Sequence, residues 1–485
     1  MKTIFFILLL FSTVTVLGYQ GCKSDEKKTK PATEASGSAG QSDPKPVPVR
    51  KPREKVSRKL LLLGIDGADW RLMDPLLDRG ALPNFKRLVA SGTRAPLKTI
   101  KPTASPLIWT TIATGVGPRK HGITDFAFKV PGKEDSLLPT SNMRRVKAIW
   151  NILSDQKTSV GVIGWWATYP AEEVVGFVVS DQASTLRNDN YRAALNLNKK
   201  TVPHLAQAET FPPELDQEIE KLIKASPDVG LQHLERFMKL PKEKLEALKA
   251  EKKVNIEDIF SVFSFALLID QAFIVASLHG IEKYRPDFAA VYLAGLDHAA
   301  EHNFWKFIEP EKFDKVTITE DDIARYSEVI NKYYIYMDEV LGRFLALYPE
   351  NESTIIVVSD HGHEANKNYD PSSDDHYNRV CSGDHNNAPD GIVLLSGKDI
   401  RAGAQLKGAS VGDIAPTVLA LMGAPVGEDM PGRVLTEAIR PEFLEAHPVT
   451  TVKTHSAGRK YSDTPVPSAM GKALTDKLKG LGYIK

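Results

Sequence analysis

Seven side chains spread between Asp66 and His385 have the chemistry of a two-metal hydrolase site. Carboxylates, imidazoles and a hydroxyl can together hold divalent cations. Two such cations about 3.5–4 Å apart can stabilise both the attacking and the leaving oxygen of a phosphoryl transfer. An Asp at the end of a strand is more often a turn former or a helix cap, so the prediction depends on the combination. The candidate residues are Asp66, Ser105, Asp297, His302, Asp360, His361 and His385.

Three segments place these polar groups close to apolar runs. In LLLGIDGADW, Asp66 directly follows such a run, and nearby glycines allow the backbone to approach an ion closely. In VVSDHGHEA, Asp360 and His361 are adjacent, so both side chains can reach a metal only if the strand ends there in a turn. In GDHNNAPDGIVLLSG, His385 lies in a loop before the next apolar run.

Short apolar runs alternate with helical stretches from residue 59 onward. Continuous apolar strands are buried on both faces, and with helices between them they predict an α/β sandwich around a central, mostly parallel sheet. Such folds bind ligands beyond the carboxyl ends of their strands, where Asp66, Asp297 and Asp360 fall. The predicted strands end at Ile65, Gly164, Ser180, Leu293, Ser359 and Ser396.

Two other stretches interrupt this alternation. Residues 185–252 are rich in Lys and Glu, with proline-marked turns and no clear strand, and predict a helical cap inserted into the sheet domain. The run from Ile259 to Leu278 is apolar enough to be considered as a membrane span. Asp270 in its middle, and the strand that follows it, favour a buried core helix. Residues 436–485 should form a polar C-terminal arm with a short amphipathic helix.

The N-terminus carries the pattern of an export signal. Residues 1–21 contain one Lys and an apolar run from Ile4 to Leu17, which is too short to span a membrane. Cys22 resembles the lipidated cysteine of a bacterial lipoprotein, although Tyr19 stands where such sites usually carry Leu. We therefore expect an exported protein anchored to a membrane through Cys22, on the periplasmic or cell-surface side. Plain secretion is the alternative.

The segment after Cys22 has almost nothing to bury. Residues 22–57 are rich in Lys, Ser, Pro and Gly and should form a disordered tether. Residues 23–59 hold eleven Lys and Arg against five Asp and Glu, and Lys2 adds one further positive charge. Since the overall charge is +1, the body from residue 60 onward carries a net charge of about −6. A body without basic excess gives no indication of a nucleic-acid-binding module. Cys381 is the other cysteine, so no disulfide framework supports the fold.

Residues 59–435 resemble the alkaline phosphatase superfamily, and within it the type I phosphodiesterase and nucleotide pyrophosphatase branch. The resemblance rests on SDHG followed by GDH and DGI, and on TASPLIWTTIATGVGPRKHGITDF, which is similar to the family's nucleophile segment. It implies an alkaline phosphatase-like three-layer sandwich with helices on both faces, formed by a catalytic domain over residues 58–435. It also implies a phosphate-ester substrate.

The resemblance further implies a division of the site residues. Counting back from Thr114 and Gly115 puts Ser105 in the nucleophile position, with Thr103 as the alternative. One metal would be held by Asp66, Ser105, Asp360 and His361, and the other by Asp297, His302 and His385. The implied reaction proceeds through a metal-activated Ser105 and a phosphoserine. Zinc is the metal that exported relatives use most often, although these ligands also accept manganese or iron.

One spacing departs from the family's pattern. The family usually has Asp, three residues and then His, whereas four residues separate Asp297 from His302. The usual spacing falls on Glu301, a plausible oxygen ligand, and a one-residue bulge would restore His302. The Phe-Trp pair after His302 resembles relatives and supports that residue. His363 belongs to a loop where charged groups usually lie outside the ligand set.

Related activities on the same scaffold are less well matched. Sulfatases need a Cys or Ser two residues before Pro and four before Arg, whereas Ser105 is followed by PLIW. An exported protein would not normally meet the glycolytic substrate of phosphoglycerate mutases, and phosphoethanolamine transferases carry several membrane spans. The resemblance therefore implies hydrolysis of phosphoric esters of the phosphodiesterase type. Phosphomonoester hydrolysis, or a non-catalytic surface-anchored binding protein on a degenerate hydrolase scaffold, remains as an alternative.

Overall fold

A computed structural model describes residues 58–129, 132, 136–183, 209–251, 255, 257–468 and 475. The expected signal peptide, Cys22, the tether and most of the expected C-terminal helix lie outside the described residues. The described residues from Arg58 onward belong to one compact unit, Val56–Lys485.

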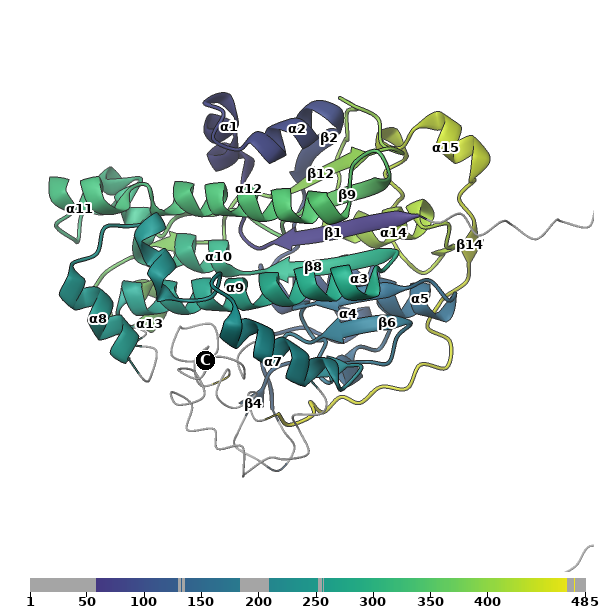
Figure 1. The fold of residues 1–485 in the computed structure, drawn as a ribbon, viewed down its shortest axis with the longest axis horizontal. Helices are drawn as coiled ribbons and strands as arrows, with labels where there is room; N and C mark the ends of the chain where they lie inside the picture. Colours follow the sequence, from purple (N-terminus) through teal and green to yellow (C-terminus); the bar gives the residue numbers. More distant parts are fainter. Residues whose placement is uncertain are drawn as a thin grey trace, which may run out of the picture. The chain divides into compact units, whose positions relative to one another are not determined.

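An eight-stranded sheet forms the centre of this unit (Figure 1). Its spatial order is β2-β12-β9-β1-β8-β5-β6-β7. The five strands from β9 to β6 are mutually parallel, whereas β12, β2 and β7 each pair antiparallel with a neighbour. The strands are β1 (Lys59–Ile65), β2 (Thr93–Leu97), β5 (Val160–Ile163), β6 (Gly176–Val179), β7 (Thr210–Phe211), β8 (Phe288–Leu293), β9 (Ser353–Val358) and β12 (Gly391–Gly397).

Helices cover both faces of the sheet, as the apolar strands require. In β1, Leu61 and Leu63 pack into one core, while Leu60 and Leu62 pack into the other. The first core is covered by α1 (Trp70–Asp78), α2 (Pro83–Ser91), α7 (Leu215–Ala225), α8 (Lys242–Ala250), α9 (Ile259–Tyr284), α10 (Gly295–Ala299) and α12 (Val329–Leu347). The second is covered by α3 (Ser105–Thr114), α5 (Ile149–Asp155), α14 (Ile414–Leu421) and α15 (Pro441–Ala446). The predicted three-layer α/β sandwich is confirmed.

Shorter elements complete the described chain. Three two-stranded ribbons pair β3 (Phe128–Lys129) with β4 (Ser136–Leu137), β10 (Glu364–Ala365) with β11 (Gly383–Asp384), and β13 (Val426–Gly427) with β14 (Thr451–Val452). The remaining α-helices are α4 (Pro118–His121), α11 (Glu320–Tyr326) and α13 (His376–Val380). The 3₁₀ turns include η4 (Leu231–Arg236) and η6 (Trp305–Phe307), and a π-helical turn, η5, covers Ala300–Phe304.

The helix α9 is the one described helix long and apolar enough to cross a membrane, with a mean hydropathy of 2.1 in its most apolar window. Because 83% of that window is buried inside the protein, we assign α9 to the core. Asp270 in its middle is fully buried and accepts hydrogen bonds from the Ala294 and Gly295 N–H groups and from the Tyr333 hydroxyl. These bonds hold the turn that leads from β8 toward Asp297.

Two strands of the central sheet, β2 and β7, were not predicted from the sequence. In β2, side chains alternate between buried and exposed, and Pro96 lies inside it. Proline is compatible with an edge strand, and an edge strand lacks the continuous apolar run of its neighbours. The two-residue β7 lies within the stretch predicted to hold no strand, where α7, η4 and α8 provide the expected helical structure.

Candidate metal centre

Three neighbouring strands bring the predicted carboxylates to one edge of the sheet. The parallel strands β9, β1 and β8 lie side by side, so their carboxyl ends coincide. Asp66 follows β1 directly, Asp360 comes two residues after β9, and Asp297 lies in the first turn of α10 after β8. All three side chains are buried, with at most 4% of each residue exposed. Such a concentration of buried negative charge requires positive charge or protons nearby.

The first group of candidate ligands consists of Asp66, Asp360 and His361. The His361 Nε2 atom lies 3.5 Å from Asp66 Oδ1 and 3.4 Å from Asp360 Oδ2. Asp66 Oδ1, both Asp360 carboxylate oxygens and His361 Nε2 have no hydrogen-bond partner among the described residues. Buried polar atoms are normally paired, so four such atoms facing one another fit the donor set of a cation.

The other oxygen of Asp66 is held by two aromatic side chains. Asp66 Oδ2 accepts hydrogen bonds from the Tyr292 hydroxyl at 2.5 Å and from Trp109 Nε1 at 3.1 Å. Trp166 Nε1 in turn donates to the Tyr292 oxygen at 2.9 Å. These bonds fix the orientation of the carboxylate and leave Oδ1 directed to His361. Supporting bonds of this kind usually orient the ligands of a metal.

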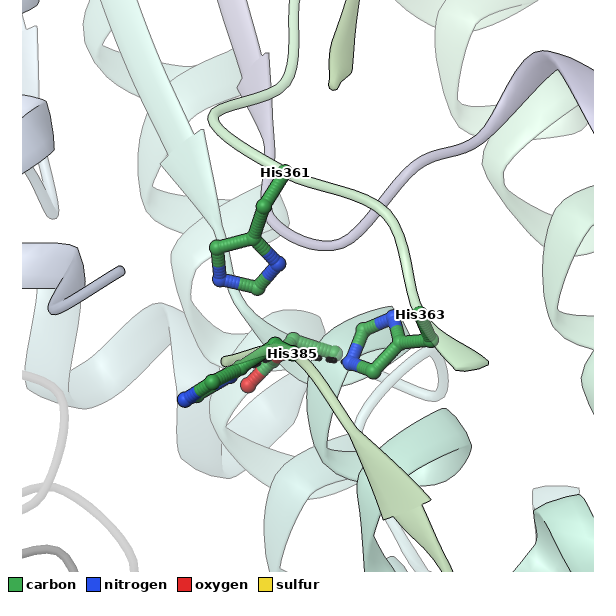
Figure 2. Close-up of side chains that lie close together, drawn as sticks. His361, His363 and His385 are labelled. Atoms are coloured by element: carbon green, nitrogen blue, oxygen red, sulfur yellow. Dashed lines mark hydrogen bonds and ion pairs between the residues drawn. The ribbon is translucent and has the colours of Figure 1, made fainter. Parts of the chain in front are cut away.

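The second group consists of Asp297, His361, His363 and His385, whose candidate ligand atoms all lie within 4.8 Å of one another. Figure 2 shows the three imidazoles gathered at one place, from the turn after β9 and from the loop after β11. His363 Nε2 lies 2.9 Å from Asp297 Oδ1, and His385 Nδ1 lies 3.8 Å from the same oxygen. His361 belongs to both groups, so the two candidate centres adjoin.

The protonation of these groups follows from burial and mutual repulsion. Burial, and then repulsion from Asp297, raise the pKa of Asp66 to about 6, and burial with repulsion from Asp66 raises the pKa of Asp360 well above its usual value. Burial would raise the pKa of Asp297 too, but hydrogen bonds with His363 and His385 hold it well below its ordinary value. A divalent cation would substitute for the protons that these carboxylates otherwise need.

Both candidate nucleophiles lie close to these groups. Ser105 is buried and begins α3. Trp109 lies one helical turn further along α3, and its bond to Asp66 links the helix to the first group. The Thr103 hydroxyl donates to the His385 backbone carbonyl at 3.0 Å. This bond joins Thr103 to the loop that carries His385.

The structure places His302 and Glu301 in a π-helical turn, η5, directly after α10. This turn is the local bulge that the extra residue after Asp297 suggested. His302 is buried, but it forms a third group with Glu301 and Cys381 and is absent from the group that contains Asp297 and His385. The Glu301 carboxylate lies between two imidazoles, with Oε1 3.6 Å from His385 Nδ1 and Oε2 3.6 Å from His302 Nδ1.

Sequence reasoning left His363 outside the ligand set. The structure buries it completely and sets its ring against Asp297. The signal was present in the sequence DHGH, because two histidines separated by a single glycine can converge when the strand before them ends in a turn.

A family model described as type I phosphodiesterase / nucleotide pyrophosphatase matches residues 60–408, which is most of the chain. The chain belongs to this family. The resemblance stated from the sequence is therefore confirmed, and the chain is a member of a family of phosphoric ester hydrolases. The matched residues contain every residue of the two groups that adjoin at His361.

Other relatives are more distant. A 2,3-bisphosphoglycerate-independent phosphoglycerate mutase from Cereibacter sphaeroides is 34% identical over 102 residues, which are 21% of this chain and only 18% of the mutase. Among solved structures, a mutant of the alkaline phosphatase PafA has 16% identity and a TM-score of 0.48, and the match covers 80% of this chain and 100% of that one. Phosphonoacetate hydrolase from Sinorhizobium meliloti, in complex with phosphonoformate, has 14% identity and a TM-score of 0.35, covering 64% and 57%.

Proposed function

We propose that this member of the phosphodiesterase family hydrolyses phosphodiesters by transferring a phosphoryl group to Ser105. The observation that carries the proposal is the pair of adjoining donor groups beside the start of α3, in which buried oxygens of Asp66 and Asp360 lack hydrogen-bond partners among the described residues. Two divalent cations fit these groups. When bound, they would lower the pKa of the attacking hydroxyl and offset the charge that develops on the phosphate and leaving oxygens.

The candidate ligands would be divided between the two cations. Asp66, Asp360 and His361 would hold one cation and, with Tyr292, keep it beside Ser105. Asp297 and His385 would hold the other. The N-terminus of the ten-residue helix α3 adds partial positive charge close to the attacking oxygen.

Two displacements would complete the reaction. In the first, the Ser105 oxygen forms a bond to phosphorus as the bond to the leaving alcohol breaks, and the hydroxyl proton ends on that alcohol. In the second, water displaces the serine oxygen, which releases a phosphomonoester and restores the Ser105 hydroxyl. The buried surroundings of Ser105, which is 5% exposed, limit competing attack by bulk water in the first step.

We propose zinc as the resident metal. The candidate ligands around Asp297 include imidazoles of three histidines, and nitrogen-rich sites of this kind favour zinc over magnesium or calcium. Manganese and iron are compatible with the mixed carboxylate and imidazole donors, so metal analysis of the purified protein decides between them.

The test compares Ser105→Ala with Thr103→Ala on bis(p-nitrophenyl) phosphate and on p-nitrophenyl phosphate. We expect Ser105→Ala to lose activity by about 10³-fold or more while it retains its fold, and Thr103→Ala to lose much less. A wild-type protein that binds metals but hydrolyses only the monoester would establish the phosphatase alternative. Loss confined to Thr103→Ala would refute the assignment of the nucleophile. A folded wild-type protein with neither metals nor turnover would establish the binding-protein alternative.

A further inference from the structure

The third ligand of the metal at Asp297 and His385 is the point at which this chain departs from its family's spacing. The usual position after Asp297 is occupied by Glu301, and the next histidine, His302, lies one residue further on. The structure absorbs this extra residue in the π-helical turn η5. The resulting orientation groups His302 with Glu301 and Cys381 and leaves it out of the group that contains Asp297, His363 and His385.

His363 occupies the place that such a ligand needs. It is fully buried, and its Nε2 lies 2.9 Å from Asp297 Oδ1. Two atoms bound to one tetrahedral zinc at about 2.0–2.1 Å lie roughly 3.3 Å apart. Asp297 Oδ1 lies 2.9 Å from His363 Nε2, which is shorter than this separation, and 3.8 Å from His385 Nδ1, which is longer.

The surrounding backbone is shaped to hold the His363 ring. Gly67, directly after Asp66, has a positive φ of +74°, and a Cβ atom there would lie 2.4 Å from His363 Cε1. A Cβ atom at Gly362 would lie 2.7 Å from Asp69 Oδ2. Both glycines therefore permit a close approach that larger residues would prevent. Preorganisation of this kind reduces the entropy lost when a ligand atom is fixed.

Two further contacts fix the position of His363. The Arg71 side chain donates to the backbone carbonyl of His363, and its Nε and Nη2 atoms both donate to Oδ2 of Asp69, which caps α1. The Trp305 ring lies against the imidazole, with ring centroids 5.9 Å apart. The Nδ1 atom of His363 has no hydrogen-bond partner among the described residues. Because Nε2 is the nitrogen that faces Asp297, it is the candidate ligand atom of His363.

We propose that His363, and not His302, is the third protein ligand of the metal bound by Asp297 and His385. The inference rests on the proposed function only in requiring a metal at this place. The ligand set then contains one carboxylate and two imidazoles, with Glu301 beside His385. It suits a divalent cation of the zinc type.

The test counts metal ions rather than turnover. The full-length wild-type chain, His363→Ala and His302→Ala are dialysed against the same zinc buffer and analysed by plasma mass spectrometry. We expect two zinc ions per chain for the wild type and for His302→Ala, and one for His363→Ala. His302 is the matched control, because it is a similarly buried histidine in a neighbouring group of candidate ligands.

Each other outcome overturns the inference. Two zinc ions in His363→Ala would mean that this histidine merely orients Asp297, and one zinc ion in His302→Ala would restore the family's usual ligand. If His363→Ala fails to fold, the milder His363→Gln replaces it in the zinc count, and two zinc ions in that variant with an unchanged zinc X-ray absorption spectrum would overturn the inference. Wild-type protein with two zinc ions but no hydrolysis would refute the proposed function and leave this inference standing.

Discussion

At the scale of single residues, the site depends on carboxylates held in fixed orientations. Asp66 has one oxygen bound by Tyr292 and Trp109 and the other directed to His361. The two aromatic donors prevent the carboxylate from rotating away from this orientation. Removing the hydrogen-bonding group of one donor, while its ring stays packed in the core, should therefore weaken metal binding.

We predict that Tyr292→Phe lowers metal affinity or kcat/KM by about 10–100-fold, which is typical for the loss of a group that orients a metal ligand. The ring would still pack against Trp109, at a centroid distance of 4.8 Å. Metal titration by calorimetry measures the effect. Tyr348→Phe is the matched control, since this buried tyrosine donates to the Pro286 carbonyl, away from the candidate ligands. It should cost about 1 kcal/mol of stability and leave metal binding unchanged.

The carboxylates also predict how pH affects the metal-free protein. The pKa of Asp66 is raised to about 6 from an ordinary value of 3.8, so between these values the folded protein binds more protons than the unfolded chain. The contribution of Asp66 to stability must then fall as pH rises through this window. A bound metal replaces the proton and should remove the fall.

Urea denaturation from about pH 4 to about pH 6, with and without metal, measures this difference. The metal-free Asp66→Asn variant should show a smaller fall than the metal-free wild type. Equal pH dependence in the metal-free and metal-loaded wild type would contradict the interpretation of these carboxylates as metal ligands.

At the scale of elements, two short turns bring the donor groups together. The turn after β1 contains Gly67, whose missing side chain makes room for His363. The π-helical turn η5 determines which of Glu301 and His302 faces His385. Each turn controls the direction of a candidate ligand.

We predict that Gly67→Ala destabilises the protein by roughly 1–3 kcal/mol from backbone strain and also weakens metal binding, because the new methyl group displaces the His363 ring. Gly80→Ala separates the two effects. Gly80 has the same φ of +74°, but no atom lies within 4 Å of the place where the alanine Cβ would be. Gly80→Ala should therefore lower the stability of the protein without weakening metal binding. Thermal melts together with metal titrations distinguish the variants, and equal metal affinities would argue against the close packing.

The same elements show what could be predicted from the sequence. The six buried strands are visible as apolar runs, and Asp66 and Asp360 follow from their position after two of these strands. The edge strands β2 and β7 are not visible in the sequence, because they form by hydrogen bonding to a neighbouring strand and lack a continuous apolar run. The position of His363 beside Asp297 was not predicted for a related reason, because it depends on the path of the turn after β9, which local spacing does not determine.

At the scale of the whole molecule, one sheet edge collects residues from Asp66 to His385. Parallel strands make this possible, since β9, β1 and β8 all end there while their connections pass over the faces. The long apolar helix α9 is largely buried within this assembly. The proposed membrane attachment therefore depends on the N-terminal segment, through Cys22.

We predict that the protein is exported and anchored to a membrane, and that Cys22→Ser releases it. Without the thiol there is no lipid anchor, and the acidic body has no basic excess to bind anionic lipids. Detergent phase partitioning should move the variant to the aqueous phase and keep the wild type in the detergent phase. Equal partitioning of the two would contradict the anchor and favour plain secretion.

The central claim is that Ser105, beside two metal-binding groups, receives the phosphoryl group. The most direct measurement is to quench the enzyme with acid during turnover of bis(p-nitrophenyl) phosphate and to locate the bound phosphoryl group by peptide mass spectrometry. We predict that it is found on Ser105 and is absent from the Ser105→Ala variant. A phosphoryl group on Thr103, or undiminished turnover by Ser105→Ala, would contradict the account.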